Sequence, residues 1–289
     1  MDVRAIVMGL AFAFMWSSAF TSARVIVAYA PPMTALSIRF LVSGLIGIGL
    51  AWLLGQSARL TGRQWIAVLV FGICQNALYL GLNFQAMQWV EASFAAIIAS
   101  TMPLLVAIAG WLFFRERPRP LAVVGLVAGI AGVALIMGMR LSGGVDLLGT
   151  VLCVIGVVSL TAATLAMRDA SSGGNLLMVV GLQMLVGSAV LAVPAALFET
   201  WVVDWTWQLG AAFAYTTLVP GLLATFTWFV LVERIGAVRA ATFHFLNPFF
   251  GVAVAAALLG EALGWLDIVG VGIIAAGILA VQLSKQTRA

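Results

Sequence analysis

The sequence of 289 residues has little charge, because only 8% of its residues are Asp, Glu, Lys or Arg. Soluble domains carry about 25% charged residues, so this composition excludes an ordinary water-soluble protein. Hydrophobic residues make up 64% of the chain, and its mean hydropathy is +1.16. We interpret the formal charge of +4 as a membrane-topology signal and predict no nucleic-acid partner.

Reactive and metal-binding side chains are equally scarce. Lys285 is the only lysine and lies near the end of the chain, so no P-loop is present and no nucleotide is expected as a ligand. Cys74 and Cys153 lie in apolar runs without ligand spacing, which predicts buried free thiols and no metal site. His244 is the only histidine, and no acidic residue lies in the middle of an apolar run. We therefore expect no enzymatic activity and no cofactor, and the sequence gives no support to ion coupling.

Long apolar runs fill most of the sequence. Each has about 20 residues, enough to cross about 30 Å of hydrocarbon as a helix. The runs are continuously apolar and do not alternate, which predicts an all-α polytopic membrane protein and excludes a barrel. The ten predicted transmembrane helices are 5–25, 33–54, 64–84, 92–114, 120–139, 146–167, 175–198, 208–231, 238–259 and 264–283.

The chain also repeats itself after 145 residues. Ala92 to Ile136 returns without a gap as Ala237 to Val281, and Pro103 in the first copy matches Pro248 in the second. In each copy an apolar helix with a proline near its middle leads to a turn with one glutamate, and a glycine-rich apolar helix follows. The sequence is therefore predicted to be a duplication, with repeats at 1–144 and 145–289.

Each predicted repeat has five spans, an odd number. The second repeat must then enter the membrane from the opposite face, so the duplication is inverted. Inverted repeats are typical of secondary transporters, because exchanging the conformations of the two repeats converts the inward-open form into the outward-open form.

Basic residues predict which side of the membrane holds the termini. Ten spans place both termini on one side, and eleven of the fourteen Lys and Arg residues fall in the connections on that side. They are Arg4, Arg59, Arg63, Arg115, Arg117, Arg119, Arg168, Arg234, Arg239, Lys285 and Arg288. Only Arg24 and Arg140 fall on the other side, so both termini are predicted to be cytoplasmic.

Aromatic and polar side chains in the first and third spans are candidate substrate-binding residues. Trp16 and Phe20 lie four apart on one face of the first span, next to Ser17, and the face serves either helix packing or a cavity wall. Gln75, Tyr79 and Asn83 are spaced four apart in the third span. Unpaired amides are costly in hydrocarbon, so this stripe predicts a water-filled pathway, with hydrogen bonding between helices as the alternative.

Prolines in the fourth and ninth spans mark a second group of candidates. Ser100 and Thr101 precede Pro103, and His244 and Asn247 precede Pro248. Kinks at matching places in two repeats are a pointer to a transporter site, with a plain packing kink as the alternative.

Arg39 and His244 are the ionisable residues within the spans. Arg39 lies about 9 Å of helical rise from the outer end of the second span. It either snorkels to the surface or pairs with a substrate carboxylate or a backbone carbonyl. As a lone histidine, His244 is typical of a hydrogen-bonded packing residue more than of a proton carrier.

These residues resemble the EamA branch of the drug/metabolite transporter superfamily. The resemblance rests on Trp16 to Phe20, on Arg39 with Phe40, and on the two copies that lead through Pro103 and Pro248 to a glutamate. It covers nearly the whole chain and implies two five-helix EamA repeats. Ser17 departs from the glycine that often follows the tryptophan in this family.

Within that branch the chain is similar to YddG-type amino-acid exporters. The resemblance implies a multi-pass protein of the cell inner membrane that exports neutral amino acids, including aromatic ones, through a central cavity by alternating access. Methionine, threonine and phenylalanine are the expected substrates, and the lipid bilayer is the other partner. The aromatic and amide-rich candidates suit a zwitterion with an uncharged side chain. The alternative is a carrier of the same superfamily that exports drugs or other small metabolites.

Overall fold

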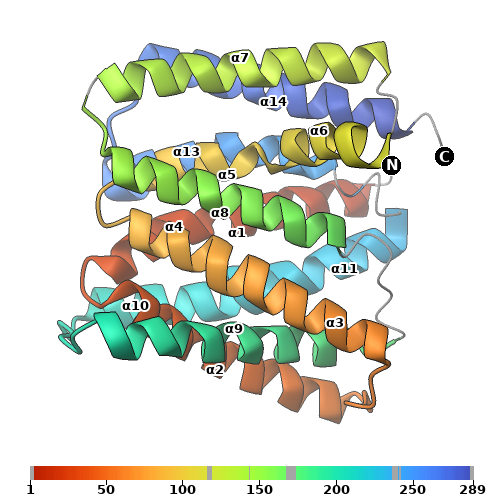
Figure 1. Ribbon diagram of the computed structural model, residues 1–289, viewed down its shortest axis with the longest axis vertical. Helices are drawn as coiled ribbons and strands as arrows, with labels where there is room; N and C mark the ends of the chain where they lie inside the picture. Colours follow the sequence, from red (N-terminus) through yellow and green to blue (C-terminus); the bar gives the residue numbers. More distant parts are fainter. Residues whose placement is uncertain are drawn as a thin grey trace. The chain divides into compact units, whose positions relative to one another are not determined.

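The fold is entirely helical over the residues that the structure describes. The computed structural model describes residues 3–115, 119–142, 144–166, 174–235, 240 and 242–286, and every regular element in these ranges is a helix (Figure 1). They are α1 (Val3–Val27), α2 (Pro32–Leu53), α3 (Gly62–Phe71), η1 (Gly72–Leu80), α4 (Gly81–Ala86), α5 (Ala92–Ser100), α6 (Met102–Phe114), α7 (Pro120–Ser142), α8 (Leu147–Ala166), α9 (Leu176–Phe198), α10 (Trp207–Thr216), η2 (Thr217–Leu223), α11 (Ala224–Ile235), η3 (Thr242–Leu246), α13 (Asn247–Leu259) and α14 (Trp265–Gln286). The predicted all-α class is confirmed.

Nine helices of the described chain are long and apolar enough to cross a membrane. A further apolar helix, Phe243–Leu259, is shorter. The predicted span over 238–259 begins among residues 236–239 and 241, which lie outside the described ranges. Large hydrophobic side chains are exposed along many of these helices, and such a surface is suited to lipid.

Residue contacts divide the chain into two compact units. The first unit consists of Met1–Thr21, Trp89–Thr150 and Leu223–Ala289, and the second of Ser22–Gln88 and Val151–Leu222. Each sequence repeat contributes segments to both units.

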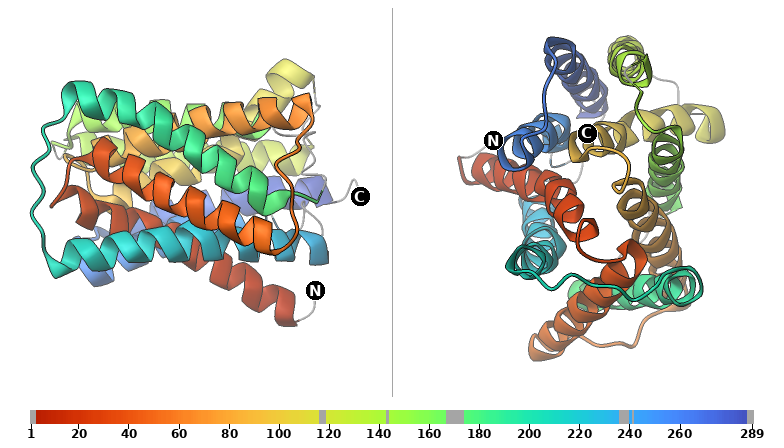
Figure 2. Two further views of the ribbon diagram at one scale, coloured as in Figure 1. Left: turned by 90° about the horizontal axis from the view of Figure 1, so that it is seen from below. Right: turned by 90° about the vertical axis from the view of Figure 1, so that its left-hand side faces the viewer.

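In the first unit, α7 packs along α14, its counterpart after the shift of 145 residues. A Cβ built at Gly125 would lie 2.6 Å from the carbonyl oxygen of Gly277, and one at Gly132 would lie 3.0 Å from that of Gly270. As numbers rise along α7 they fall along its partner, so the two helices are antiparallel. Repeat-related helices that run in opposite directions are what an inverted duplication requires. Figure 2 shows the pair side by side.

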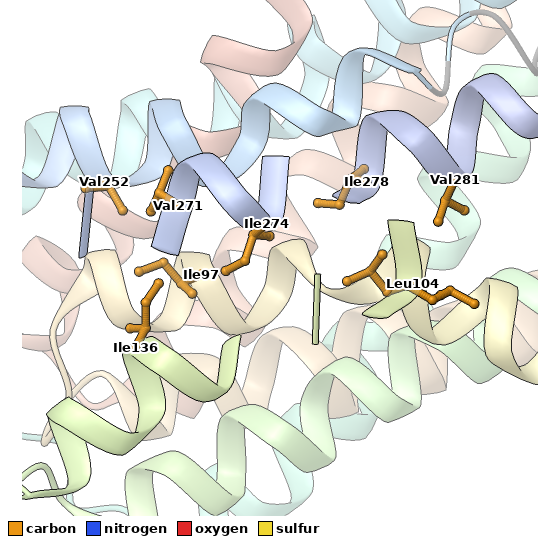
Figure 3. Packing of buried hydrophobic residues seen from close by; sticks show 9 residues of the cluster. Ile97, Leu104, Ile136, Val252, Val271, Ile274, Ile278 and Val281 are labelled. Atoms are coloured by element: carbon orange, nitrogen blue, oxygen red, sulfur yellow. The ribbon is translucent and has the colours of Figure 1, made fainter. Parts of the chain in front are cut away.

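The hydrophobic core of the first unit lies against α14. Figure 3 shows Ile274 and Ile278 of this helix facing Ile97 of α5, Leu104 of α6 and Ile136 of α7. With Val252 of α13, branched aliphatic side chains from five helices share one cluster, in which well-defined rotamers favour close packing. The cluster fixes α5 and α6, which carry the first of the two predicted proline sites.

In the second unit, α2 and α9 form the equivalent antiparallel pair. A Cβ at Gly44 would lie 2.9 Å from the carbonyl oxygen of Gly181. Further along, the Ser37 hydroxyl donates to the Ser188 carbonyl at 2.9 Å, and the Ser188 hydroxyl donates to the Ser37 carbonyl at 2.8 Å. Small residues and reciprocal hydroxyl bonds are a usual means of joining helices in membranes.

Both repeats contain a π-helix at the same place. η1 begins at Gly72 and η2 at Thr217, which are 145 residues apart. π-Helical turns inside α-helices are rare and are frequent at functional sites. The two segments belong to the second unit.

Carboxylates close the ends of two helices. The backbone N–H groups of Ala92 and Ser93 donate to Glu261 at 2.8 and 3.0 Å, and those of Met33 and Thr34 donate to Glu199 at 2.8 and 2.7 Å. First-turn N–H groups lack partners within their helix, and an acceptor with negative charge satisfies them. Glu116, the repeat counterpart of Glu261, lies outside the described residues.

Candidate functional site

An aromatic cluster lies in the first unit, where α1, α11 and η3 meet. The ring of Phe12 lies 5.8 Å from that of Trp16, 4.7 Å from that of Trp228 and 5.3 Å from that of His244, measured between centroids. Trp228 and His244 lie 5.1 Å apart. Phe12 is buried, whereas the other three rings are half-buried and present part of their surface. Rings at such distances interact favourably in tilted and edge-to-face arrangements.

His244 is linked to the start of α13 by an amide. The Nδ2 atom of Asn247 lies 3.0 Å from Nδ1 of His244, and Oδ1 of Asn247 has no hydrogen-bond partner among the described residues. Because an amide nitrogen only donates, Nδ1 accepts and a neutral ring carries its proton on Nε2. Asn247 therefore retains a buried acceptor beside the aromatic cluster. Pro248 follows within the first turn of α13, where its missing N–H costs nothing.

The first proline site is closed by its own hydroxyl groups. The helix breaks at Thr101 between α5 and α6, with Pro103 in the first turn of α6. The Ser100 hydroxyl donates to the Ile97 carbonyl and the Thr101 hydroxyl to the Ile98 carbonyl, both at 2.7 Å. These hydroxyls are engaged within the helix, which favours the packing-kink alternative for this pair.

The amide stripe predicted in the third span lies partly on a π-helix. Gln75 and Tyr79 belong to η1, where i→i+5 hydrogen bonds replace the α-helical i→i+4 pattern, and Asn83 belongs to α4. Gln75 is half-buried, whereas Tyr79 and Asn83 are buried. The Asn83 amide donates to the Tyr79 carbonyl at 2.8 Å, and its Oδ1 has no partner among the described residues. A Cβ at Gly156 would lie 2.8 Å from Nδ2 of Asn83, so α8 covers this side chain.

The remaining candidates are buried. Ser17 is buried and its hydroxyl has no partner in the described part of the chain, and Phe20 lies one turn further along α1. Arg39 is only 5% exposed, so the predicted alternative of snorkelling to the surface is wrong. Cys74 and Cys153 are free thiols; Cys153 is buried, as predicted, whereas Cys74 is half-buried. The described residues contain no group of three His, Cys, Asp or Glu side chains that would hold a metal.

The candidate residues divide between the two units. Nine belong to the first unit: Trp16, Ser17, Phe20, Ser100, Thr101, Pro103, His244, Asn247 and Pro248. Four belong to the second: Arg39, Gln75, Tyr79 and Asn83. Phe12 contacts both Trp16 and His244, and His244 in turn contacts Asn247.

Two interacting residues had no role in the sequence analysis. Trp228 of α11 contacts both Phe12 and His244. Asn76 of η1 donates to the Gln183 carbonyl of α9 at 2.9 Å. Neither contact follows from the spacing within one helix, because each joins helices that are far apart in the sequence.

Comparison with protein families gives two consecutive matches. The EamA-like transporter family matches residues 3–138 and 147–283. The two ranges together span nearly the whole chain. This agrees with the resemblance found in the sequence.

Individual relatives include the uncharacterized transporter YvbV of Bacillus subtilis, 26% identical over 95% of this chain and 90% of that protein. The aromatic amino acid exporter YddG of Ancylobacter novellus is 28% identical over 39% of each chain. A protein of known crystal structure matches the whole of both chains with a TM-score of 0.71 at 20% identity, which shows a shared fold.

Proposed function

Because the chain belongs to the EamA-like transporter family, we propose that it exports neutral amino acids, including aromatic ones, across the cell inner membrane. Methionine, threonine and phenylalanine are the substrates that we expect. The similarity to an aromatic amino acid exporter supports this choice of substrate, although it covers 39% of the chain. The observation that carries the proposal is the aromatic cluster, in which the half-buried rings of Trp16, Trp228 and His244 surround the buried Phe12 and adjoin Asn247.

The cluster offers chemistry that suits such a substrate. Aromatic faces bind apolar and aromatic side chains, and they attract an ammonium group. The Oδ1 atom of Asn247, which has no partner among the described residues, is a buried acceptor for an N–H donor. A carboxylate in the middle of a span would favour a strongly cationic substrate, but the acidic residues of the sequence lie in predicted connections and at span ends. Asp267 is buried, and at the start of α14 it accepts a hydrogen bond from the Gly264 N–H.

We infer that transport uses alternating access between repeat-related packings. In each unit, repeat-related helices lie antiparallel, which permits two arrangements related by the duplication. In the first unit, Trp16 and the segment around Pro248 are the residues that we propose for substrate passage, with the segment around Pro103 as a kink beside them. In the second unit they are Tyr79 and Asn83. We place both termini in the cytoplasm, on the distribution of basic residues.

Transport by the purified protein tests the substrate. Proteoliposomes that hold the full chain are given radiolabelled methionine, with unlabelled phenylalanine, threonine, glutamate, lysine, a nucleoside or a quaternary ammonium compound as competitors. Saturable uptake that only the neutral amino acids inhibit is expected. Transport of the quaternary ammonium compound in place of methionine would instead support the drug-carrier alternative, which the aromatic faces also suit.

A matched pair of tryptophan variants tests the site. Trp16→Ala removes a ring of the cluster, and we expect methionine uptake to fall by at least about tenfold, in line with loss of an aromatic contact. Trp205→Ala removes a ring that is 84% exposed in a connection and should leave uptake unchanged. Equal uptake by both variants, at wild-type protein levels, would reject the cluster as the site.

A further inference from the structure

Arg39 is a buried cation in α2 of the second unit. It is 5% exposed, its guanidinium carbon lies 5.0 Å from the centre of the adjacent Phe40 ring, and its Nε atom has no hydrogen-bond partner in the described chain. No ion pair joins it to a described acidic residue. Arginine stays protonated in proteins, and an unpaired buried charge is costly. Among the described residues, therefore, no acidic side chain balances this charge.

Ser43 lies one helical turn beyond Arg39. It is fully buried, and its hydroxyl also lacks a hydrogen-bond partner among the described residues. Across from α2, Gly221 of η2 approaches both groups: a Cβ built there would lie 3.3 Å from Nη2 of Arg39 and 3.7 Å from Oγ of Ser43. The Arg39 guanidinium and the Ser43 hydroxyl thus both lie near Gly221, and each group carries one atom, Nε and Oγ respectively, without a hydrogen-bond partner among the described residues.

The duplication shows that the fold does not require this arrangement. The repeat counterparts of Arg39, Ser43 and Gly221 are Met184, Ser188 and Asn76. Met184 is uncharged, Ser188 donates to the Ser37 carbonyl, and Asn76 donates to the Gln183 carbonyl. At equivalent positions the polar groups of one copy are hydrogen-bonded, whereas in the other copy Nε of Arg39 and Oγ of Ser43 have no hydrogen-bond partner among the described residues.

We propose that Arg39 and Ser43 bind the carboxylate group of the transported substrate. The proposal rests on the proposed amino-acid transport and names the group that this part of the protein recognises. A guanidinium binds a carboxylate through parallel N–H donors, and the serine hydroxyl supplies one more donor. One cation matches the single charge of a monocarboxylate and would leave a phosphate dianion half neutralised. The contact between the substrate carboxylate and Arg39 also offsets the unfavourable free energy of burying the guanidinium without a counter-charge.

Analogues of one amino acid test the contact during transport. Methionine uptake into proteoliposomes is measured with phenylalanine or phenylalaninamide as the competitor, since the amide keeps the ring and the amine but lacks the carboxylate. In the wild-type protein the amide should inhibit at least about tenfold less well, as expected for loss of a charge-assisted hydrogen bond. Equal inhibition by both compounds would overturn the carboxylate site and leave amino-acid transport intact.

Single substitutions test which residues cause the preference for phenylalanine over phenylalaninamide. Arg39→Gln should remove the difference between the two competitors, and Arg39→Lys should retain part of it, because the charge remains without the planar donor pair. Ser43→Ala should reduce the difference by a few fold. Arg59→Gln, in an exposed connection, is the matched control and should behave as the wild type. If Arg39→Gln still prefers phenylalanine to phenylalaninamide as strongly as the wild type does, the proposal is rejected. If Arg39→Gln does not fold, the same comparison is made with Arg39→Lys and Ser43→Ala, and an unchanged preference in both rejects the proposal.

A binding measurement separates this proposal from the proposed function. Thermal stabilisation of the purified full chain is measured with 3-phenylpropionate, a carboxylate without an amine, and with 3-phenylpropionamide. If the protein transports no amino acid, the proposed function fails; stabilisation by the carboxylate alone, lost in Arg39→Gln but kept in Arg59→Gln, would still support the site. Equal stabilisation of wild type and Arg39→Gln, or none by the carboxylate, would overturn it.

Discussion

The π-helices η1 and η2 occupy equivalent positions in the two repeats, yet they meet α9 and α2 in different ways. At η1, Asn76 packs against Gly187 and donates to the Gln183 carbonyl. At η2, Gly221 faces Arg39 and Ser43, whose Nε and Oγ atoms have no partner in the described residues. The first contact satisfies its polar groups and holds the helices together. The second leaves polar groups unsatisfied, which is what a ligand site requires and what stability disfavours.

Replacing Arg39 by its repeat counterpart should have the largest effect on stability. In Arg39→Met the unpaired cation is exchanged for an apolar side chain, and we expect the apparent free energy of unfolding to rise by about 1–4 kcal/mol. The measurement is chemical denaturation of the purified protein in detergent, without substrate. Arg59→Met in an exposed connection should change it by less than about 0.5 kcal/mol. A less stable Arg39→Met would show that Arg39 has a stabilising partner, which contradicts the comparison.

Adding a methyl group at the contact between η1 and α9, where Asn76 meets Gly187, should have the next largest effect on stability. A Cβ at Gly187 would lie 2.5 Å from Cβ of Asn76, so Gly187→Ala forces η1 and α9 apart. Overpacking of this kind costs about 1–3 kcal/mol, measured by the same denaturation. Gly49→Ala in α2 is the matched control, since no atom would lie within 4 Å of its Cβ. A loss of stability of the same size in both variants would deny that the contact is close-packed.

Removing the Asn76 amide at the contact between η1 and α9 should lower the free energy of unfolding by a smaller amount. Asn76→Ala deletes the hydrogen bond to the Gln183 carbonyl, and bonds between helices in membranes contribute about 0.6–2 kcal/mol. Gln75→Ala, at the neighbouring half-buried amide, should stay within about 0.5 kcal/mol. Denaturation curves with equal midpoints for the two variants would show that the Asn76 bond does not hold η1 to α9.

Much of this fold could be predicted from the sequence, because hydrocarbon restricts the choice. Continuous apolar runs have few alternatives to membrane helices, and the shift of 145 residues identified α7 and α14 as counterparts without predicting that they pack together. The left-handed residues that end α6 and α13, Arg115 and Gly260, also obey this shift. The repeat thus related distant segments of the chain to each other, and the structure shows which of them are in contact.

The π-helices and the contacts between distant helices could not be predicted in this way. The spacing of Gln75, Tyr79 and Asn83 is α-helical in the sequence, and nothing in it signals the extra residue per turn in η1. The packing of Trp228 depends on which helix faces α11. Arg39 was identified as a candidate, but that its Nε is unpartnered depends on what surrounds α2.

The smallest expected effect comes from two serines at equivalent positions. Ser188 donates to the Ser37 carbonyl at 2.8 Å, whereas the Ser43 hydroxyl has no partner in the described chain. Ser188→Ala should therefore lower the free energy of unfolding by about 0.5–1.5 kcal/mol, and Ser43→Ala should change it by less than about 0.5 kcal/mol. Both substitutions remove one oxygen from a buried site, so the difference measured by denaturation reports the hydrogen bond itself. If both variants lose the same free energy of unfolding, the Ser43 hydroxyl has a hydrogen-bond partner in the folded protein. The contacts of η1 with α9 and of η2 with α2 would then contribute similarly to stability.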